Sequence, residues 1–192
     1  MADLAMASTK IEDFRAKLTG GGARGSQFEV ILTFPTNKNM GIDVTASELS
    51  RFMINATSLP ASSIQPIRVF YRGRPINVAG ERQFAEWTVN VMIDGDMKIR
   101  RAFEVWSASI LNHDQTNGIL SPKDYQTNMT VKQLDRNNNV LRAYTMVNCF
   151  PINISEVRLN YADTANIEEF QVTFALDYWN VEGDTSSKPT VG

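Results

Sequence analysis

The longest run of patterned hydrophobic positions lies between Gln83 and Leu111 and predicts a strand followed by a helix. From Phe84 to Asp94 the side chains alternate, with one parity holding Ala85, Trp87, Val89, Val91 and Ile93. The other parity is polar except for Met92 and holds Glu86, Thr88, Asn90 and Asp94. A period of two is typical of a strand with one buried face and one solvated face.

The period changes to that of a helix after the turn Asp94-Gly95-Asp96, where we expect Asp96 to be the N-cap. Large apolar side chains then recur at helical spacing, at Ile99, Phe103, Trp106 and Ile110. We expect this stripe to pack on the sheet together with Trp87. Burial of each large side chain should contribute ~1.5–3 kcal/mol.

A short helix is predicted near the N-terminus, where Thr9-Lys10-Ile11-Glu12 has the form of a capping box. Its apolar side carries Ile11, Phe14 and Leu18, and Gly20-Gly21-Gly22 ends it. A helix this short is marginal alone in water, so it needs a surface on which to dock.

The rest of the chain predicts strands separated by turns, at 27–34, 52–59, 64–71, 74–78, 125–134, 140–150, 154–159 and 168–179. Arg72-Gly73 joins a hairpin, a further turn is expected at Ala79-Gly80, and Pro151 is expected to interrupt a strand. Segments 36–50 and 112–122 are polar and predict loops, the first with a helical turn near Ser47. The predicted fold is mainly β, a β-barrel or sandwich of about eight strands with one flanking amphipathic helix.

Length and composition favour one domain in an ordinary soluble chain of 192 residues. We expect an N-terminal arm at 1–26, a β domain at 27–180 and a mobile C-terminal tail at 181–192. The formal charge of −2 argues against a general polyanion binder. No apolar run approaches the ~20 residues that span a bilayer, and the first residues lack the features of a secretory signal.

No set of catalytic or metal-binding residues stands out. His113 is the only histidine and is predicted to be a solvated loop residue rather than an acid or base. Cys149 is the only cysteine and falls on an apolar strand parity, which predicts a small buried residue rather than a nucleophile and fits a reducing compartment. Clustered metal ligands and phosphate-binding motifs are missing from the sequence, so we expect no enzyme and no cofactor.

The predicted hairpin is the candidate interaction surface, because it is longer than a compact core needs. It combines apolar side chains with arginines, as an interface with an apolar centre and charged rim does. The candidate residues are Ile64, Ile67, Val69, Tyr71, Arg72, Arg74, Ile76 and Arg82. Arg68 and Phe70 extend this set into a basic and aromatic group that could instead contact nucleic acid. A hairpin that is simply solvated is the third possibility, beside a subunit interface and a nucleic-acid contact.

Short motifs along the chain together resemble the tail tube proteins of contractile-tailed bacteriophages. The resemblance runs from Gly21 to Trp179, and its order and spacing are more specific than any one motif. It rests on Gly21-Gly22-Ala23-Arg24, Phe28-Glu29-Val30, Phe34-Pro35, Leu59-Pro60, Tyr71-Arg72-Gly73-Arg74, Ala79-Gly80-Glu81-Arg82, Phe84, Trp87, Asp94, Phe103, Trp106, Cys149-Phe150-Pro151, Phe170, Val172, Phe174 and Asp177-Tyr178-Trp179.

The resemblance implies a virion protein, made and assembled in the host cytoplasm, whose hexameric rings share one inner barrel and stack into a hollow tube. It also implies contacts with the tail sheath, tape measure, baseplate and tail-terminator proteins, and DNA only in transit. The hairpin would then join rings. Glu86, Thr88 and Asn90 would face the lumen, with an outer face covered by sheath as the alternative. A type VI secretion-like tube protein and a nucleic-acid-binding β-barrel are the competing functions.

Overall fold

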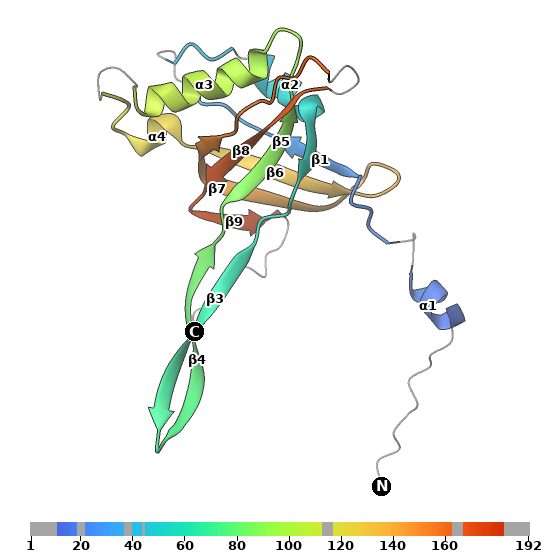
Figure 1. The fold of residues 1–192 in the computed structure, drawn as a ribbon. Helices are drawn as coiled ribbons and strands as arrows, with labels where there is room; N and C mark the ends of the chain where they lie inside the picture. Colours follow the sequence, from blue (N-terminus) through green and yellow to red (C-terminus); the bar gives the residue numbers. More distant parts are fainter. Residues whose placement is uncertain are drawn as a thin grey trace.

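The computed structural model describes residues 11–18, 22–36, 40–43, 45–112, 117–162 and 167–182. Within these ranges the chain forms a sheet, a projecting hairpin and a few short helices (Figure 1). The elements in chain order are α1 (Ile11–Lys17), β1 (Phe28–Ile31), α2 (Thr45–Met53), β2 (Ile54–Thr57), β3 (Ser62–Tyr71), β4 (Arg74–Phe84), β5 (Trp87–Met92), α3 (Lys98–Ile110), α4 (Pro122–Tyr125), β6 (Thr127–Leu134), β7 (Val140–Ile154), β8 (Glu169–Ala175) and β9 (Tyr178–Val181).

The main sheet has seven antiparallel strands in the order β1-β6-β7-β8-β5-β2, with β9 also paired to β7. The predicted mainly β class with a flanking helix is confirmed. A closed barrel is not: within the described residues, β1 and β2 form the two ends of the sheet order and do not pair with each other. The sheet of a single chain is therefore open, and both end strands keep an unpaired edge.

Strand β7 turns a corner that joins the two halves of the sheet. Its first part pairs with β6 and β9, and its last part pairs with β8. At the corner Asn148 has a φ of 58°, a left-handed conformation that asparagine tolerates better than most residues. Its side-chain amide donates a hydrogen bond to Asp177 Oδ2 at 2.6 Å, and its backbone N–H donates to Asn128 Oδ1 at 3.2 Å.

The prediction that Pro151 interrupts this strand is wrong, and so is the separate strand at 154–159. Pro151 is paired with Phe174 inside β7, next to a register shift that lies between Pro151 and Asn153. A proline fits within a sheet at such an irregularity, because one ladder hydrogen bond is already lost there.

Helix α3 covers one face of the sheet, and an aromatic cluster fills the space between them. Ile99, Phe103 and Trp106 are fully buried, and Ile110 is partly buried against the same core. The ring of Phe103 lies 5.0 Å from that of Phe34, centre to centre, and the ring of Trp87 lies 5.6 Å from that of Phe174. The Trp106 indole N–H donates to the carbonyl of Tyr125 at 2.8 Å, so this buried polar group has a partner.

The start of α3 is capped by Asp94, and the prediction of Asp96 is wrong. The backbone N–H groups of Lys98 and Ile99 donate to the Asp94 carboxylate at 3.0 and 3.4 Å. Met97, between the two acids and the helix, has a left-handed φ of 53°. With this turn the Asp96 carboxylate lies beside the Lys98 ammonium group instead, at 2.9 Å.

We expect Asp94→Ala to lower the free energy of unfolding by ~0.5–2 kcal/mol, because the first turn of α3 loses its side-chain acceptor. Asp96→Ala is the matched control and should cost no more than ~0.5 kcal/mol, because an exposed ion pair contributes little. Urea unfolding of both variants measures the difference. Equal losses for the two variants would contradict the assignment of the cap to Asp94.

Other element boundaries differ from the prediction for local reasons. The strand predicted from Phe84 is two strands, because β4 ends at Phe84 and β5 begins at Trp87, after the exposed Ala85 and Glu86. The strand predicted at 168–179 breaks at Asp177, which separates β8 from β9. Helix α2 occupies the end of the expected polar loop and includes Phe52 and Met53, so β2 starts later than predicted.

Candidate assembly interface

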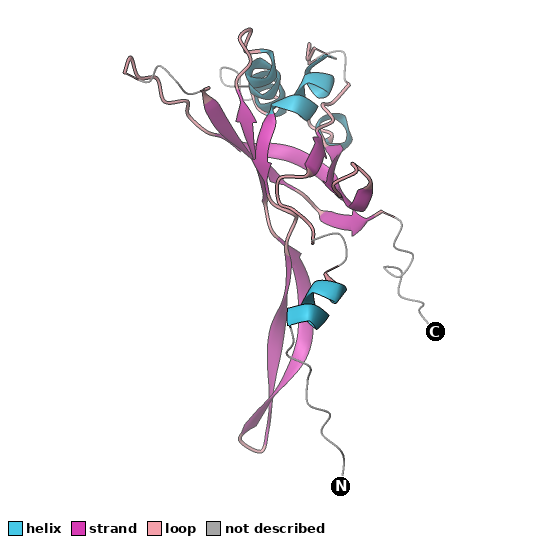
Figure 2. Cartoon of the chain, turned by 90° about the vertical axis from the view of Figure 1, so that its right-hand side faces the viewer, coloured by secondary structure: helices cyan, strands magenta, loops and turns pink. Residues whose placement is uncertain are grey.

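The β3–β4 hairpin projects away from the sheet as a two-stranded arm (Figures 1 and 2). Every side chain from Ser63 to Ala79 is exposed. The base of the arm is fixed to the domain by Trp179, whose ring lies 6.2 Å from that of Phe84 and whose indole N–H donates to the carbonyl of Ala61 at 3.3 Å. Among the described residues, most of the arm therefore contacts only its own two strands.

No turn forms at Ala79-Gly80, which corrects the prediction. Gly80 lies within β4, where the pairing with β3 shifts between Ile64 and Pro66. A Cβ atom at Gly80 would overlap the carbonyl oxygen of Gln65, so the close approach of the two strands requires glycine here. The bulge lengthens the hairpin beyond the predicted end of its second strand.

The strand register gives the hairpin two unlike faces. On one face the pairs Ile67–Val78 and Val69–Ile76 lie opposite each other, with Tyr71 and Arg74 next toward the tip. We call Ile67, Val69, Ile76 and Val78 the apolar ladder; their exposed fractions lie between 49% and 55%. A two-stranded hairpin is marginally stable in water by itself, so the ladder indicates a surface that another chain segment covers.

The other face and the tip carry most of the arginines. Arg72 and Gly73 have φ values of 48° and 79°, as a tight type I′ hairpin turn needs, and the Arg72 guanidinium lies 5.4 Å from the centre of the Tyr71 ring. Arg82 is nearer the base and donates to Ser62 Oγ at 3.1 Å. The structure thus places the predicted interface residues on two faces and a tip rather than on one surface.

Sequence reasoning left Val78 out of the candidate interface and named Phe70 only as part of the nucleic-acid alternative. Val78 belongs to the apolar ladder but stood next to the expected turn, and Phe70, 71% exposed, lies on the opposite face from the ladder. The alternation of β4 places Val78 on the same face as Ile76, and the alternation of β3 places Phe70 on the opposite face with Arg68.

The sheet face that points away from α3 is polar and neutral over its centre. Thr88 and Asn90 of β5 lie on this face, since Trp87, Val89 and Val91 point into the core. Thr88 Oγ1 lies 3.4 Å from Thr173 Oγ1, and the Gln171 side-chain amide donates to Asn90 Oδ1 at 3.2 Å. We call Thr88, Asn90, Gln171 and Thr173 the polar face. Glu86 is exposed in the link between β4 and β5, outside the strand.

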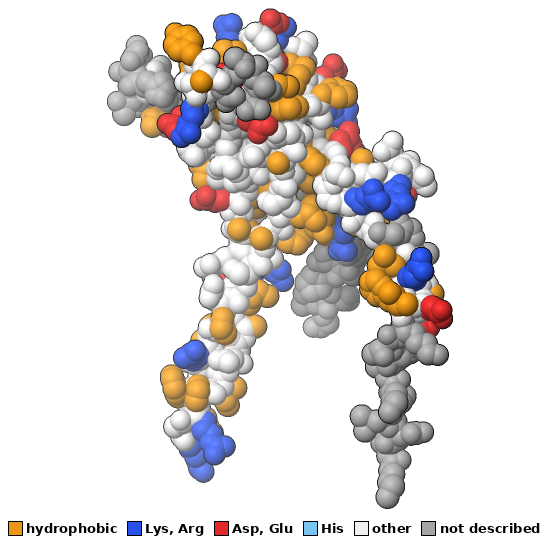
Figure 3. All heavy atoms as spheres, turned by 45° about the vertical axis from the view of Figure 1, so that its right-hand side comes forward, with side chains coloured by type: hydrophobic (Ala, Val, Ile, Leu, Met, Phe, Trp, Pro, Cys, Tyr) orange, Lys and Arg blue, Asp and Glu red, His pale blue; other side chains and the backbone are white. Residues whose placement is uncertain are grey.

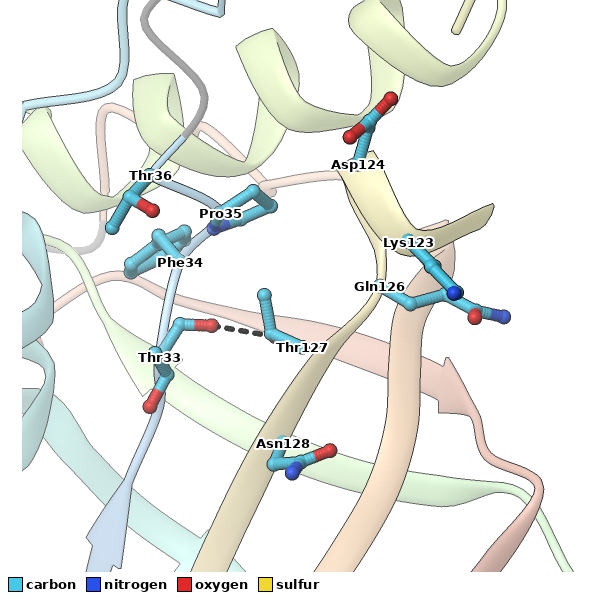
Figure 4. Close-up of a pocket in the computed structure, with 9 residues that line it drawn as sticks. All are labelled: Thr33, Phe34, Pro35, Thr36, Lys123, Asp124, Gln126, Thr127 and Asn128. Carbon is cyan, nitrogen blue, oxygen red and sulfur yellow. Dashed lines mark hydrogen bonds between the residues drawn. The ribbon is translucent and has the colours of Figure 1, made fainter. Parts of the chain in front are cut away.

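A hollow with a volume of about 570 Å³ lies between the end of β1 and the start of β6. Figure 4 shows its lining at Thr33–Thr36, Lys123, Asp124 and Gln126–Asn128, with Lys123 and Asp124 pointing in different directions. Thr127 Oγ1 donates to the carbonyl of Thr33 at 2.7 Å and ties the two walls together. The lining lacks the paired nucleophile and base that catalysis needs.

The remaining chemical groups contribute no reactive site within the described ranges. Cys149 is fully buried, and burial raises the pKa of its thiol to about 12, so it stays protonated at neutral pH. Groups of His, Cys, Asp and Glu arranged to hold a metal do not occur there. The described helices are too short or too polar to cross a membrane. His113 lies outside the described residues.

Sequence comparison places residues 23–182 within the family model described as "Phage tail tube protein". The tail tube protein gp19 of Enterobacteria phage T4 is 33% identical over 168 residues, covering 86% of this chain and 95% of the relative. The tail tube protein of Serratia phage KSP90 is 24% identical over 183 residues, covering 92% and 98% of the two chains.

Solved structures with the same fold come from contractile injection systems. A chain of the PVC sheath-tube complex in the extended state superposes with a TM-score of 0.58 at 14% identity, covering 91% of this chain and 99% of that one. A chain of the anti-feeding prophage tube-terminating cap gives 0.59 at 15% identity, covering 84% and 91%. The family match and the T4 relative show that this chain belongs to the phage tail tube proteins, which are structural, non-enzymatic components of the contractile tail of the virion.

Proposed function

We propose that copies of this chain form hexameric rings that stack into the hollow tail tube, and that DNA passes through this tube at ejection. The observation that carries the proposal is the β3–β4 hairpin, a long arm whose apolar ladder is exposed in the single chain. An arm of this kind fits between copies. Rings stack without closing when the surfaces at their two ends are complementary, and the hairpin supplies one such surface.

The two unpaired edges of the sheet support the proposal that strands of adjacent copies pair with each other. In the described part of one chain, β1 and β2 have no partner on their outer sides. Unpaired strand edges promote association with another sheet. We propose that strands of adjacent subunits join into one inner barrel, which a single chain does not form.

We propose that the polar face lines the channel, with Glu86 near one end of β5. Amide and hydroxyl groups that already bond one another, such as Asn90 with Gln171, present little net charge to a passing polyanion. A channel wall with little net charge neither attracts nor repels DNA strongly, so DNA can pass along it. The competing arrangement turns this face outward, under the sheath.

The assemblies that contain the structural neighbours suggest which proteins this chain contacts. Those neighbours come from a sheath-tube complex, a baseplate and tube-terminating assemblies. We propose that this chain contacts the corresponding sheath, baseplate and terminator proteins, and the tape measure protein inside the tube. We also propose the division of the chain into an N-terminal arm at 1–26, a β domain at 27–180 and a C-terminal tail at 181–192.

Assembly of the purified chain tests the proposal. We expect sedimentation velocity to detect species larger than the monomer as concentration rises, and negative-stain images to contain rings or tubes. A strictly monomeric protein over a wide concentration range, together with its absence from tubes extracted from virions, would contradict the proposal.

The channel assignment makes a separate prediction. In purified tubes, Thr88→Cys and Asn90→Cys should react with a small maleimide but only slowly with one too bulky to enter the bore. Cys149 gives little background because its thiol is buried and protonated. Arg101→Cys, on the exposed side of α3, is the control and should react with both reagents. Fast bulky labelling at Thr88→Cys would place the polar face outside.

A further inference from the structure

Helix α1 has an apolar side that does not join the core. Ile11, Phe14 and Leu18 recur at helical spacing and are 73%, 64% and 44% exposed. The helix has seven residues, too few to be stable alone in water. A second surface is therefore needed to keep α1 folded, and the described core does not provide it.

The apolar ladder of the hairpin is the matching unpartnered surface. Figure 1 shows α1 and the hairpin as two projections beyond the same end of the sheet, and Figure 3 shows hydrophobic side chains on both, with the two arms separated. In one chain the two apolar surfaces therefore do not cover each other, and each is available to a second copy.

We propose that α1 of one copy docks on the apolar ladder of the adjacent copy in the same ring. The inference rests on the proposed ring. Phe14 and Ile11 would cover the pairs Val69–Ile76 and Ile67–Val78, which form a flat apolar strip two residues wide.

The length of the connecting chain allows this pairing. The chain between Leu18 and Phe28 contains a run of three glycines and can span up to about 33 Å. That length lets α1 leave its own domain and reach a neighbour.

Docking of α1 on the ladder leaves the tip and the opposite face of the hairpin available. Arg72 at the tip and Phe70 on the other face remain exposed for contact with the next ring. One arm would thus serve two contacts, one within a ring and one between rings.

Disulfide cross-linking in assembled tubes tests the proposal. The double variant Phe14→Cys, Val69→Cys is oxidised in tubes and run on a denaturing gel without reductant. We expect a series of linked products on the gel, from dimers up to the number of subunits in one ring, because each subunit is linked only to its neighbours in the same ring. A series of linked products that continues past the ring size would place the contact between rings. Loss of both free thiols without a gain in mass would place the contact within one copy. Either result overturns the proposal.

Two matched controls test whether linkage is specific to the apolar ladder and to the apolar side of α1. Asn77→Cys replaces Val69→Cys on the opposite face of the hairpin, and Ala16→Cys replaces Phe14→Cys on the opposite side of α1. We expect each control pair to give at least tenfold less linked product. Tubes that form normally without linkage in the test variant overturn the docking of α1 but leave the proposed tube intact, whereas absence of tubes from the wild type counts against the tube itself.

A measurement on the unmodified chain covers the case in which the double variant fails to assemble. Trypsin cuts after Arg15 and Lys17 in α1, and we expect at least tenfold slower cleavage there in wild-type tubes than in free subunits. Equal cleavage rates in the two states would show that α1 stays uncovered and would overturn the proposal.

Discussion

Replacing Arg72 and Arg74 together with glutamate is expected to leave the subunit folded and to prevent rings from stacking into long tubes. Both side chains lie at the exposed end of the hairpin, where substitutions usually change stability by ~0.5 kcal/mol or less. In the proposed contact between stacked rings, the two arginines face a surface of complementary charge. Glutamates in their place would face like charges at every such contact. Negative-stain images give the tube length, and thermal unfolding of the free subunit reports the fold.

A control variant with the same change in net charge shows whether the effect depends on the position of the two arginines. Arg101→Glu with Arg136→Glu reverses two exposed arginines on α3 and on the β6–β7 turn, away from the hairpin. We expect tubes of ordinary length from this control. Ordinary tubes from the hairpin variant, with unchanged resistance to salt, would move the inter-ring contact to another surface.

Trp106→Ala is expected to produce the largest loss of stability, ~3–5 kcal/mol in the free energy of unfolding. The Trp106 ring lies 5.7 Å from that of Phe34 and 6.2 Å from that of Phe174, so its removal opens a cavity where α3 meets the sheet. Urea unfolding of the free subunit, followed by circular dichroism, measures the change.

The control Trp106→Phe keeps an aromatic ring in place and removes the hydrogen bond to the carbonyl of Tyr125. We expect a smaller loss, ~1–3 kcal/mol, because one buried acceptor is left without its partner. A midpoint for Trp106→Ala within a degree or two of the wild type would contradict the packing of α3 on the sheet.

Much of the fold could be predicted because large apolar residues repeat regularly. The stripe on α3 and the alternation of β5 need no knowledge of tertiary structure, since the side chains of one face must be buried together. Helix α2 was predicted only as a helical turn near Ser47, and its full length could not be found in this way. Its two buried residues are Ala46 and Ser50, which are too small or too polar to mark a hydrophobic face.

Local backbone geometry explains most of the errors. Asp94 and Asp96 are equally good caps by residue type, and only the left-handed Met97 decides between them. Pro151 is normally a strand breaker, but the bulge beside it lets β7 continue. Such irregularities depend on neighbouring strands that the local sequence does not reveal.

The candidate interface was predictable in position but not in detail. Arginines and β-branched residues around Arg72-Gly73 indicated a contact surface. The division into an apolar ladder and a more basic face depends on the register of β3 with β4 between the tip and Gly80. Val78 was left out of the candidate interface because a turn was expected directly after it, although it alternates with Ile76 along β4.

A cryo-electron microscopy reconstruction of the assembled tube tests the central claim most directly. The account predicts six subunits in each ring, strands of adjacent copies joined into one inner barrel, the polar face of Thr88 and Asn90 toward the bore, and the β3–β4 hairpin between subunits. A reconstruction in which the hairpin extends freely into solvent, or in which the polar face lies on the outer wall, would contradict it.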